Sequence, residues 1–119
     1  MKKKRQVFSH MIPIQNIRSE VGEDKRVYLL KEKTKNRIMK KLIDLFHKNQ
    51  YFRIHLDDIG TFVWNNINGK NSIKELGSIL RTHNNVKDIV QPEERVERFI
   101  LMLLKNKFIK ISGEKEGPV

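Results

Sequence analysis

The stretch Leu56–Leu76, LDDIGTFVWNNINGKNSIKEL, constrains the fold most, because it contains the end of one element and the starts of two others. Asp57 precedes an apolar run with the single tryptophan of the chain, and an acidic residue at this position is typical of a helix N-cap. Asn68-Gly69 is a typical helix stop. The spacing therefore predicts a helix over about residues 58–67.

Two further helices follow in the same half of the chain. Ser72 and Glu75 have the spacing of a capping box, which predicts a helix that runs to about Thr82. Pro92, followed by two glutamates, predicts the start of a third helix, because proline suits the first helical position and acids suit the positive end of the helix dipole. This helix is expected to reach about Asn106.

The N-terminal half contains strand-like runs. Met11–Ile17 and Arg26–Leu30 flank a turn that contains Gly22 and Asp24, so a hairpin of these two runs is expected. Pro13 lacks an N–H and places the first strand at a sheet edge. YFRIHL, residues 51–56, alternates as a third strand does.

These elements predict an α+β, winged-helix-like domain over residues 11–111, with about three N-terminal strands beside a three-helix cluster. Residues 35–48 form an inserted basic amphipathic helix in this interpretation, and residues 107–111 a last short strand. Residues 1–10 are expected to be a flexible basic tail and residues 112–119 a disordered tail.

Composition excludes several classes of function. The chain has no cysteine, so disulfides, thiolate zinc sites and cysteine nucleophiles are excluded. It has no apolar run of membrane-spanning or signal-peptide length, so a cytoplasmic location without a membrane span is expected. The net charge of +11 is uneven: residues 1–56 carry 15 Lys and Arg against 5 Asp and Glu, whereas residues 57–119 carry 10 against 9. The nearly neutral helical half argues against nucleic-acid binding, since phosphate contacts supply most of that affinity.

No pattern indicates an enzyme or a cofactor site. The four histidines are scattered without metal-ligand spacing. Asp57-Asp58 could be a catalytic carboxylate pair, but a helix cap followed by a dipole-stabilising acid is the far commoner meaning of such a pair. We therefore expect no catalytic residue, no metal and no cofactor.

The third helix, PEERVERFILMLLKNKF, is apolar around much of its circumference. Val96, Phe99, Ile100 and Leu103 fall on one stripe, with Leu104 at its margin, whereas Leu101 and Met102 lie well off it. Either another part of the chain covers this second surface, or a partner does.

The third strand is the other candidate surface. A strand at a sheet edge has unpaired backbone groups that can bind an extended peptide. Strand and helix together would form a peptide groove. The expected peptide contacts are Tyr51, Phe52, Arg53, Ile54, His55 and Leu56 on the strand, and Arg95, Arg98, Leu101, Met102 and Lys105 on the helix.

Residues 51–111, about half of the chain, resemble the pyrroloquinoline-quinone synthesis protein D (PqqD) family. The family pattern is L-[ND]-x-x-[GA]-x-x-[VI]-W-x-x-x-[ND]-G, followed by a helix start of the form [ST]-[IV]-x-E-[IL]. The matching residues are Leu56, Asp57, Gly60, Val63, Trp64, Asn68, Gly69, Ser72, Ile73, Glu75 and Leu76, then Phe108 and Ile109.

The resemblance implies a RiPP recognition element, a winged-helix peptide chaperone of natural-product biosynthesis. Such domains bind the leader segment of a ribosomally made precursor peptide and present it to a modifying enzyme, often a radical S-adenosylmethionine protein. In the family the leader adds as a strand beside the third strand and lies against the third helix. This chain departs from the family in its inserted helix and in KNKF (residues 105–108), which replaces a glycine-containing turn.

Two other functions stay open. A winged-helix DNA-binding transcriptional regulator fits the basic composition, although its recognition helix would begin with Glu93 and Glu94. A structural subunit that dimerises through the apolar helix is the third, so a monomer and a homodimer are both compatible with the sequence.

Overall fold

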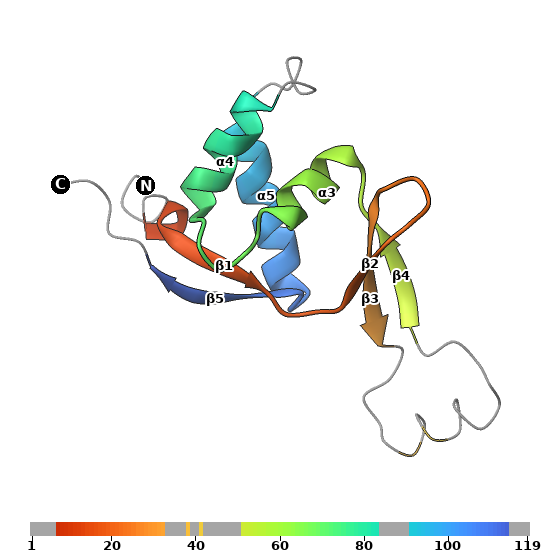
Figure 1. Ribbon diagram of the computed structural model, residues 1–119. Helices are drawn as coiled ribbons and strands as arrows, with labels where there is room; N and C mark the ends of the chain where they lie inside the picture. Colours follow the sequence, from red (N-terminus) through yellow and green to blue (C-terminus); the bar gives the residue numbers. More distant parts are fainter. Residues whose placement is uncertain (1–6, 33–37, 39–40, 42–50, 84–90, 115–119) are drawn as a thin grey trace. The chain divides into compact units, whose positions relative to one another are not determined.

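The computed structural model describes residues 7–32, 38, 41, 51–83 and 91–114 (Figure 1). These described residues fall into two compact units, one within the ranges 1–16 and 59–119 and the other within the range 17–58. Each unit has its own antiparallel sheet, so the prediction of a mixed α+β fold is confirmed. The inserted helix predicted over residues 35–48 falls almost entirely outside the described residues.

The first unit combines a two-stranded sheet with three helices. Strand β1 (Met11–Gln15) pairs antiparallel with β5 (Ile109–Glu114), and Pro13 lies at an irregularity in their register. The helices are α3 (Asp58–Asn65), α4 (Ile73–Thr82) and α5 (Pro92–Lys105). The buried apolar residues of this unit come from all three helices and from the chain around β5: Val63, Trp64, Ile67, Ile73, Leu76, Leu80, Val96, Ile100, Leu103, Phe108 and Ile109.

The predicted start of α4 is confirmed in detail. The Glu75 N–H donates to Ser72 Oγ at 3.2 Å, and the Ser72 N–H donates to Glu75 Oε1 at 3.0 Å, which together make a capping box. Ser72 is only 3% exposed, so these bonds satisfy polar groups that would otherwise be buried without partners.

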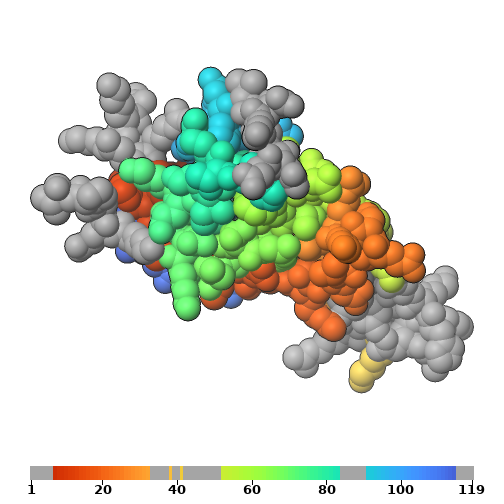
Figure 2. All heavy atoms as spheres, turned by 45° about the horizontal axis from the view of Figure 1, so that its top comes forward, coloured from red at the N-terminus to blue at the C-terminus, as the bar shows by residue number. Residues whose placement is uncertain are grey.

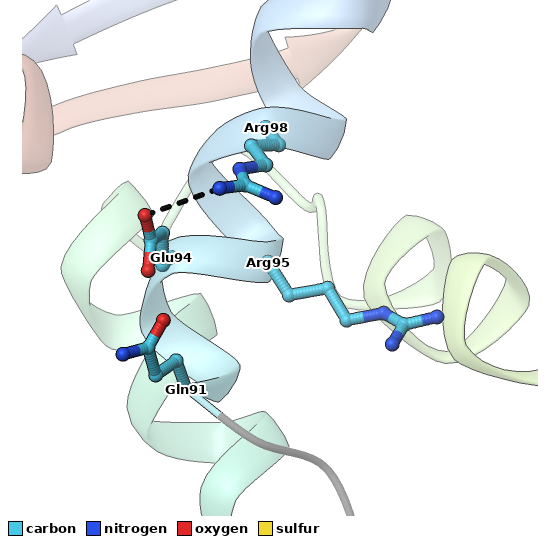
Figure 3. Close-up of a pocket in the computed structure, with 4 residues that line it drawn as sticks. All are labelled: Gln91, Glu94, Arg95 and Arg98. Carbon is cyan, nitrogen blue, oxygen red and sulfur yellow. Dashed lines mark hydrogen bonds and ion pairs between the residues drawn. The ribbon is translucent and has the colours of Figure 1, made fainter.

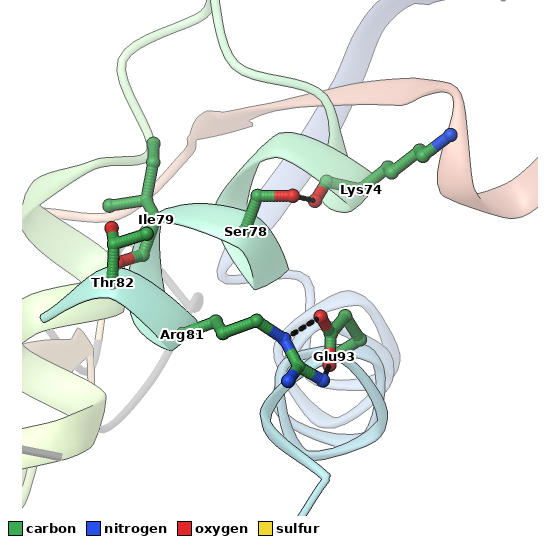
Figure 4. Close-up of polar contacts among 6 residues, drawn as sticks. All are labelled: Lys74, Ser78, Ile79, Arg81, Thr82 and Glu93. Atoms are coloured by element: carbon green, nitrogen blue, oxygen red, sulfur yellow. Dashed lines mark hydrogen bonds and ion pairs between the residues drawn. The ribbon is translucent and has the colours of Figure 1, made fainter. Parts of the chain in front are cut away.

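Helices α4 and α5 approach closely at Gly77. A Cβ atom added there would lie 3.1 Å from the Glu93 Cα, so a larger residue would push the two helices apart. Arg81 of α4 then binds both carboxylate oxygens of Glu93 on α5, at 2.6 and 2.7 Å (Figure 4). These contacts hold the start of α5 in a defined orientation against α4. The outer surface of α4 faces the viewer in Figure 2.

The second unit is a three-stranded sheet in the order β2-β3-β4. Its strands are β2 (Ser19–Val21), β3 (Val27–Glu32) and β4 (Tyr51–His55), so the predicted third strand is confirmed to within one residue. Beyond β4, Arg26 binds Asp58 with a nitrogen–oxygen distance of 2.9 Å. This ion pair lowers the pKa of the Asp58 carboxyl. Asp58 is therefore an ion-pair partner of Arg26 at the start of α3.

The predicted hairpin of Met11–Ile17 with Arg26–Leu30 is wrong. The turn itself forms at the predicted position, around Gly22 and Asp24, because the Gly22 N–H donates to the Arg26 carbonyl at 2.9 Å. A turn this tight pairs only the residues that flank it directly, so β3 takes the short strand β2 as its partner. Strand β1 is too far back along the chain and pairs with β5 instead.

The ends of the described chain are more ordered than predicted. Residues 7–9, within the predicted tail, form a helical turn. The last strand was predicted over residues 107–111 but runs over Ile109–Glu114, and it includes residues assigned to the C-terminal tail. Residues 1–6 and 115–119 lie outside the described ranges.

The last strand starts late because Lys107 still belongs to the end of α5. The Lys107 N–H donates to the Leu104 carbonyl at 3.0 Å and the Phe108 N–H to the Leu103 carbonyl at 2.9 Å, the bonding of a Schellman motif. Lys107 has a φ of 61°, the left-handed region that such a motif requires and that favours glycine. Here a lysine occupies the position.

Lys107→Gly should therefore stabilise the protein, by about 0.5–1 kcal/mol, because it removes a side chain from a left-handed conformation that costs L-residues about 1–2 kcal/mol. Urea unfolding monitored by Trp64 fluorescence measures the difference. Lys105→Gly is the matched control: it removes a lysine two residues earlier, inside α5, and should destabilise by about 1 kcal/mol. Equal effects of the two substitutions would contradict the conformational explanation.

Candidate peptide-binding surfaces

The structure places the predicted contact residues on two surfaces, one in each unit. We call residues Tyr51–His55 with their outer backbone groups the β4 edge. We call the exposed side of α5 the α5 face; its residues are Gln91, Glu94, Arg95, Arg98, Leu101, Met102 and Lys105.

The α5 face follows from the helical period. Successive residues turn by about 100°, which places Arg95, Arg98, Met102 and Lys105 within one arc and Leu101 at its margin. Val96, Ile100 and Leu103 occupy the opposite side and are fully buried. Leu101 is 54% exposed and Met102 38%, so the prediction that these two residues lie off the core stripe is confirmed.

Near its start, the α5 face contains a shallow hollow of about 230 Å³, lined by Gln91, Glu94, Arg95 and Arg98 (Figure 3). Arg98 binds Glu94 Oε1 at 3.3 Å, whereas the Arg95 side chain points away from this pair. Gln91, just before Pro92, has a φ of 55° and begins the helix without a side-chain cap. Three cations against one carboxylate make the α5 face electropositive.

Sequence reasoning missed Gln91 and Glu94 as part of this surface. Glu94 could have been found, because it lies four residues before Arg98 on a helix, a spacing at which opposite charges pair. Gln91 could not have been found from the sequence, because its place beside the α5 face depends on its left-handed backbone conformation before Pro92.

Strand β4 is the last strand of its sheet among the described residues. The Leu56 N–H donates to the Val27 carbonyl at 2.9 Å, and the antiparallel register then directs the backbone groups of Phe52 and Ile54 toward β3 as well. The N–H and C=O groups of Tyr51, Arg53 and His55 therefore point to the outer side of the sheet. An added strand would bond to these three residues.

The side chains of β4 alternate between the two faces of the sheet. Phe52 is 55% exposed, and it shares its face with Ile54. Arg53 and His55 are exposed on the other face, where the His55 ring meets Tyr28 edge-on at 4.5 Å.

Leu56 does not belong to the candidate surface. It is 5% exposed, and its N–H already bonds to Val27. The structure thus assigns Leu56 to the core, in contrast to its predicted peptide contact, because it lies opposite Val27 of β3, which is itself only 1% exposed.

The structure describes the β4 edge and the α5 face separately, so the groove predicted between them stays a prediction. Within the described ranges, no three His, Asp or Glu side chains gather as metal ligands. None of the described helices combines the length and the apolar character needed to cross a membrane.

We compared the chain with protein-family models, with curated proteins and with solved structures. None of the three comparisons gives a significant match. The resemblance to the pyrroloquinoline-quinone synthesis protein D family therefore stays a prediction from the sequence motif.

The Arg81–Glu93 pair, which orients the start of α5, should make stability depend on acid pH. Its hydrogen bond lowers the pKa of the Glu93 carboxyl from the ordinary 4.5. A lowered pKa in the folded state adds stability above the ordinary value, and this stability is lost as the pH falls through the lowered pKa. The effect is modest, because both side chains are partly exposed to solvent.

Glu93→Gln should therefore reduce the free energy of unfolding at pH 7, and its difference from the wild type should shrink as the pH falls below the ordinary 4.5. Urea titrations over a series of pH values from 7 downward measure this convergence. Glu94→Gln, whose ion pair with Arg98 is longer at 3.3 Å, is the control and should show a smaller change. A Glu93→Gln difference that is constant with pH would exclude a role for this ion pair.

Proposed function

We propose that this chain is a non-catalytic peptide chaperone. It binds the leader segment of a ribosomally made precursor peptide and presents it to a modifying enzyme of the radical S-adenosylmethionine class. The main support is the β4 edge, where three residues direct backbone donors and acceptors outward from the last strand that the described part of the chain contributes to this sheet. Such an edge binds an extended peptide through its backbone.

The α5 face supports the proposal as a second contact. Its exposed Leu101 and Met102 supply apolar area, and Arg95, Arg98 and Lys105 supply positive charge. An acidic, partly apolar leader would match both properties, so its affinity should fall as salt is added. The winged-helix arrangement, with the leader between strand and helix, is part of this proposal.

The direct test is an amide-shift titration of the labelled protein with the leader of the precursor encoded beside its gene. Shifts should concentrate in residues 51–55 and 95–105 at micromolar peptide. The control is a scrambled leader of the same composition. If the leader causes no shifts, the proposal is wrong; broad shifts with duplex DNA that vanish in salt would instead support a transcriptional regulator, for which the cations of the α5 face also provide contacts.

Met102→Glu should weaken leader binding at least about fivefold, because it places a charge where an apolar contact is expected. Ile14→Glu is the matched control: Ile14 of β1 is 40% exposed, close to the 38% of Met102, and its substitution should leave the affinity unchanged. Calorimetric titration measures both. An unchanged affinity of the Met102→Glu protein would remove the α5 face from the binding surface.

A further inference from the structure

The β4 edge has a charge pattern that selects among extended peptides. Arg53 is exposed at the centre of β4 and forms no ion pair among the described residues. Acidic residues lie toward both ends of the strand: Glu32 is the cross-strand neighbour of Tyr51, and Asp57 follows two residues after His55. Arg53 is thus the one arginine or lysine of β4 and lies at its centre, and the exposed Lys31, the cross-strand neighbour of Phe52, adds positive charge beside it.

Apolar side chains flank this charge on the opposite face of the sheet. Phe52 and Ile54, on either side of Arg53, both point to the face that also carries Leu56. In an antiparallel addition to the outer side, ligand residues opposite Phe52 and Ile54 form the closer, non-hydrogen-bonded pairs. Their side chains then contact Phe52 and Ile54 directly, whereas the residue between them lies beside Arg53.

The same pattern disfavours a second copy of this chain as the occupant. If two β4 edges paired antiparallel about their centres, Arg53 would lie opposite Arg53, and like charges directly opposite are destabilising. A peptide with an acidic residue at its centre gains an attractive pair instead. Charge complementarity thus favours an acidic peptide over self-association.

We propose that the β4 edge selects an extended segment with an apolar–acidic–apolar sequence, whose acidic residue lies beside Arg53 and whose apolar residues contact Phe52 and Ile54. This inference rests on the proposed function, because it requires strand addition at β4. It adds the class of ligand that the edge accepts. The alternation holds for a parallel or an antiparallel ligand, since the side-chain period of a strand is two in both cases.

A selection from a displayed library of random seven-residue segments tests the inference without a known ligand. The wild-type protein should enrich segments with Asp or Glu between two apolar residues, at least about fivefold over segments with Lys or Arg at the centre. The Arg53→Glu protein should reverse this preference. Lys110→Glu makes the same charge change at an exposed position of β5 in the other sheet and should retain the wild-type preference.

Each selected peptide is then titrated into the labelled wild-type protein. If peptides shift the amides of Tyr51, Arg53 and His55 but lack the apolar–acidic–apolar pattern, or if Arg53→Glu selects the same sequences, the inference is wrong and the proposed function stands. If neither these peptides nor the native leader shifts the three amides, both are wrong. A wild-type dimer joined through β4, detected by light scattering and by the same amide shifts on dilution, would also overturn the inference.

Discussion

The close approach of α4 and α5 at Gly77 determines which side of α5 is buried and which side is left exposed. Because a Cβ at Gly77 would lie 3.1 Å from the Glu93 backbone, the two helices meet through backbone rather than through long side chains. This contact, with the Arg81–Glu93 ion pair, turns Val96, Ile100 and Leu103 into the core. The rotation that buries these residues necessarily exposes Leu101 and Met102, since about 100° separates successive helical residues.

In the proposed function, the two candidate surfaces would obtain their specificity from different physics. The β4 edge would bind an extended chain through its backbone donors and acceptors, and its selectivity would come from the side chains of Phe52, Arg53 and Ile54. The α5 face has no such backbone groups and depends on apolar area and charge. Under the same proposal, Arg53 would also disfavour pairing of the edge with a second copy, a common role for charged residues on edge strands. A strand that binds peptides would need this protection, because the outer backbone groups of Tyr51, Arg53 and His55 would otherwise accept any strand.

Local signals in the sequence were most reliable where a single side chain satisfies nearby backbone groups. Ser72 and Glu75 mark the start of α4, and Pro92 that of α5, because each satisfies or removes a donor within one helical turn. The strand at Tyr51–His55 and the exposure of Leu101 and Met102 were also predictable, since both follow from a period of two or 3.6 residues. Strand pairing was not, and β1 was assigned to the wrong partner because its true partner, β5, lies about a hundred residues away along the chain.

By itself, then, the sequence determined where the helices begin, which residues share a face and where the hairpin turns. These properties depend on neighbours within one or two turns of the chain. Only the tertiary structure decided that β1 pairs with β5, that Leu56 is buried, and that Lys107 takes a left-handed conformation to end α5. These outcomes depend on contacts between distant segments or on the balance between local strain and helix capping, and no local pattern of residue types specifies them.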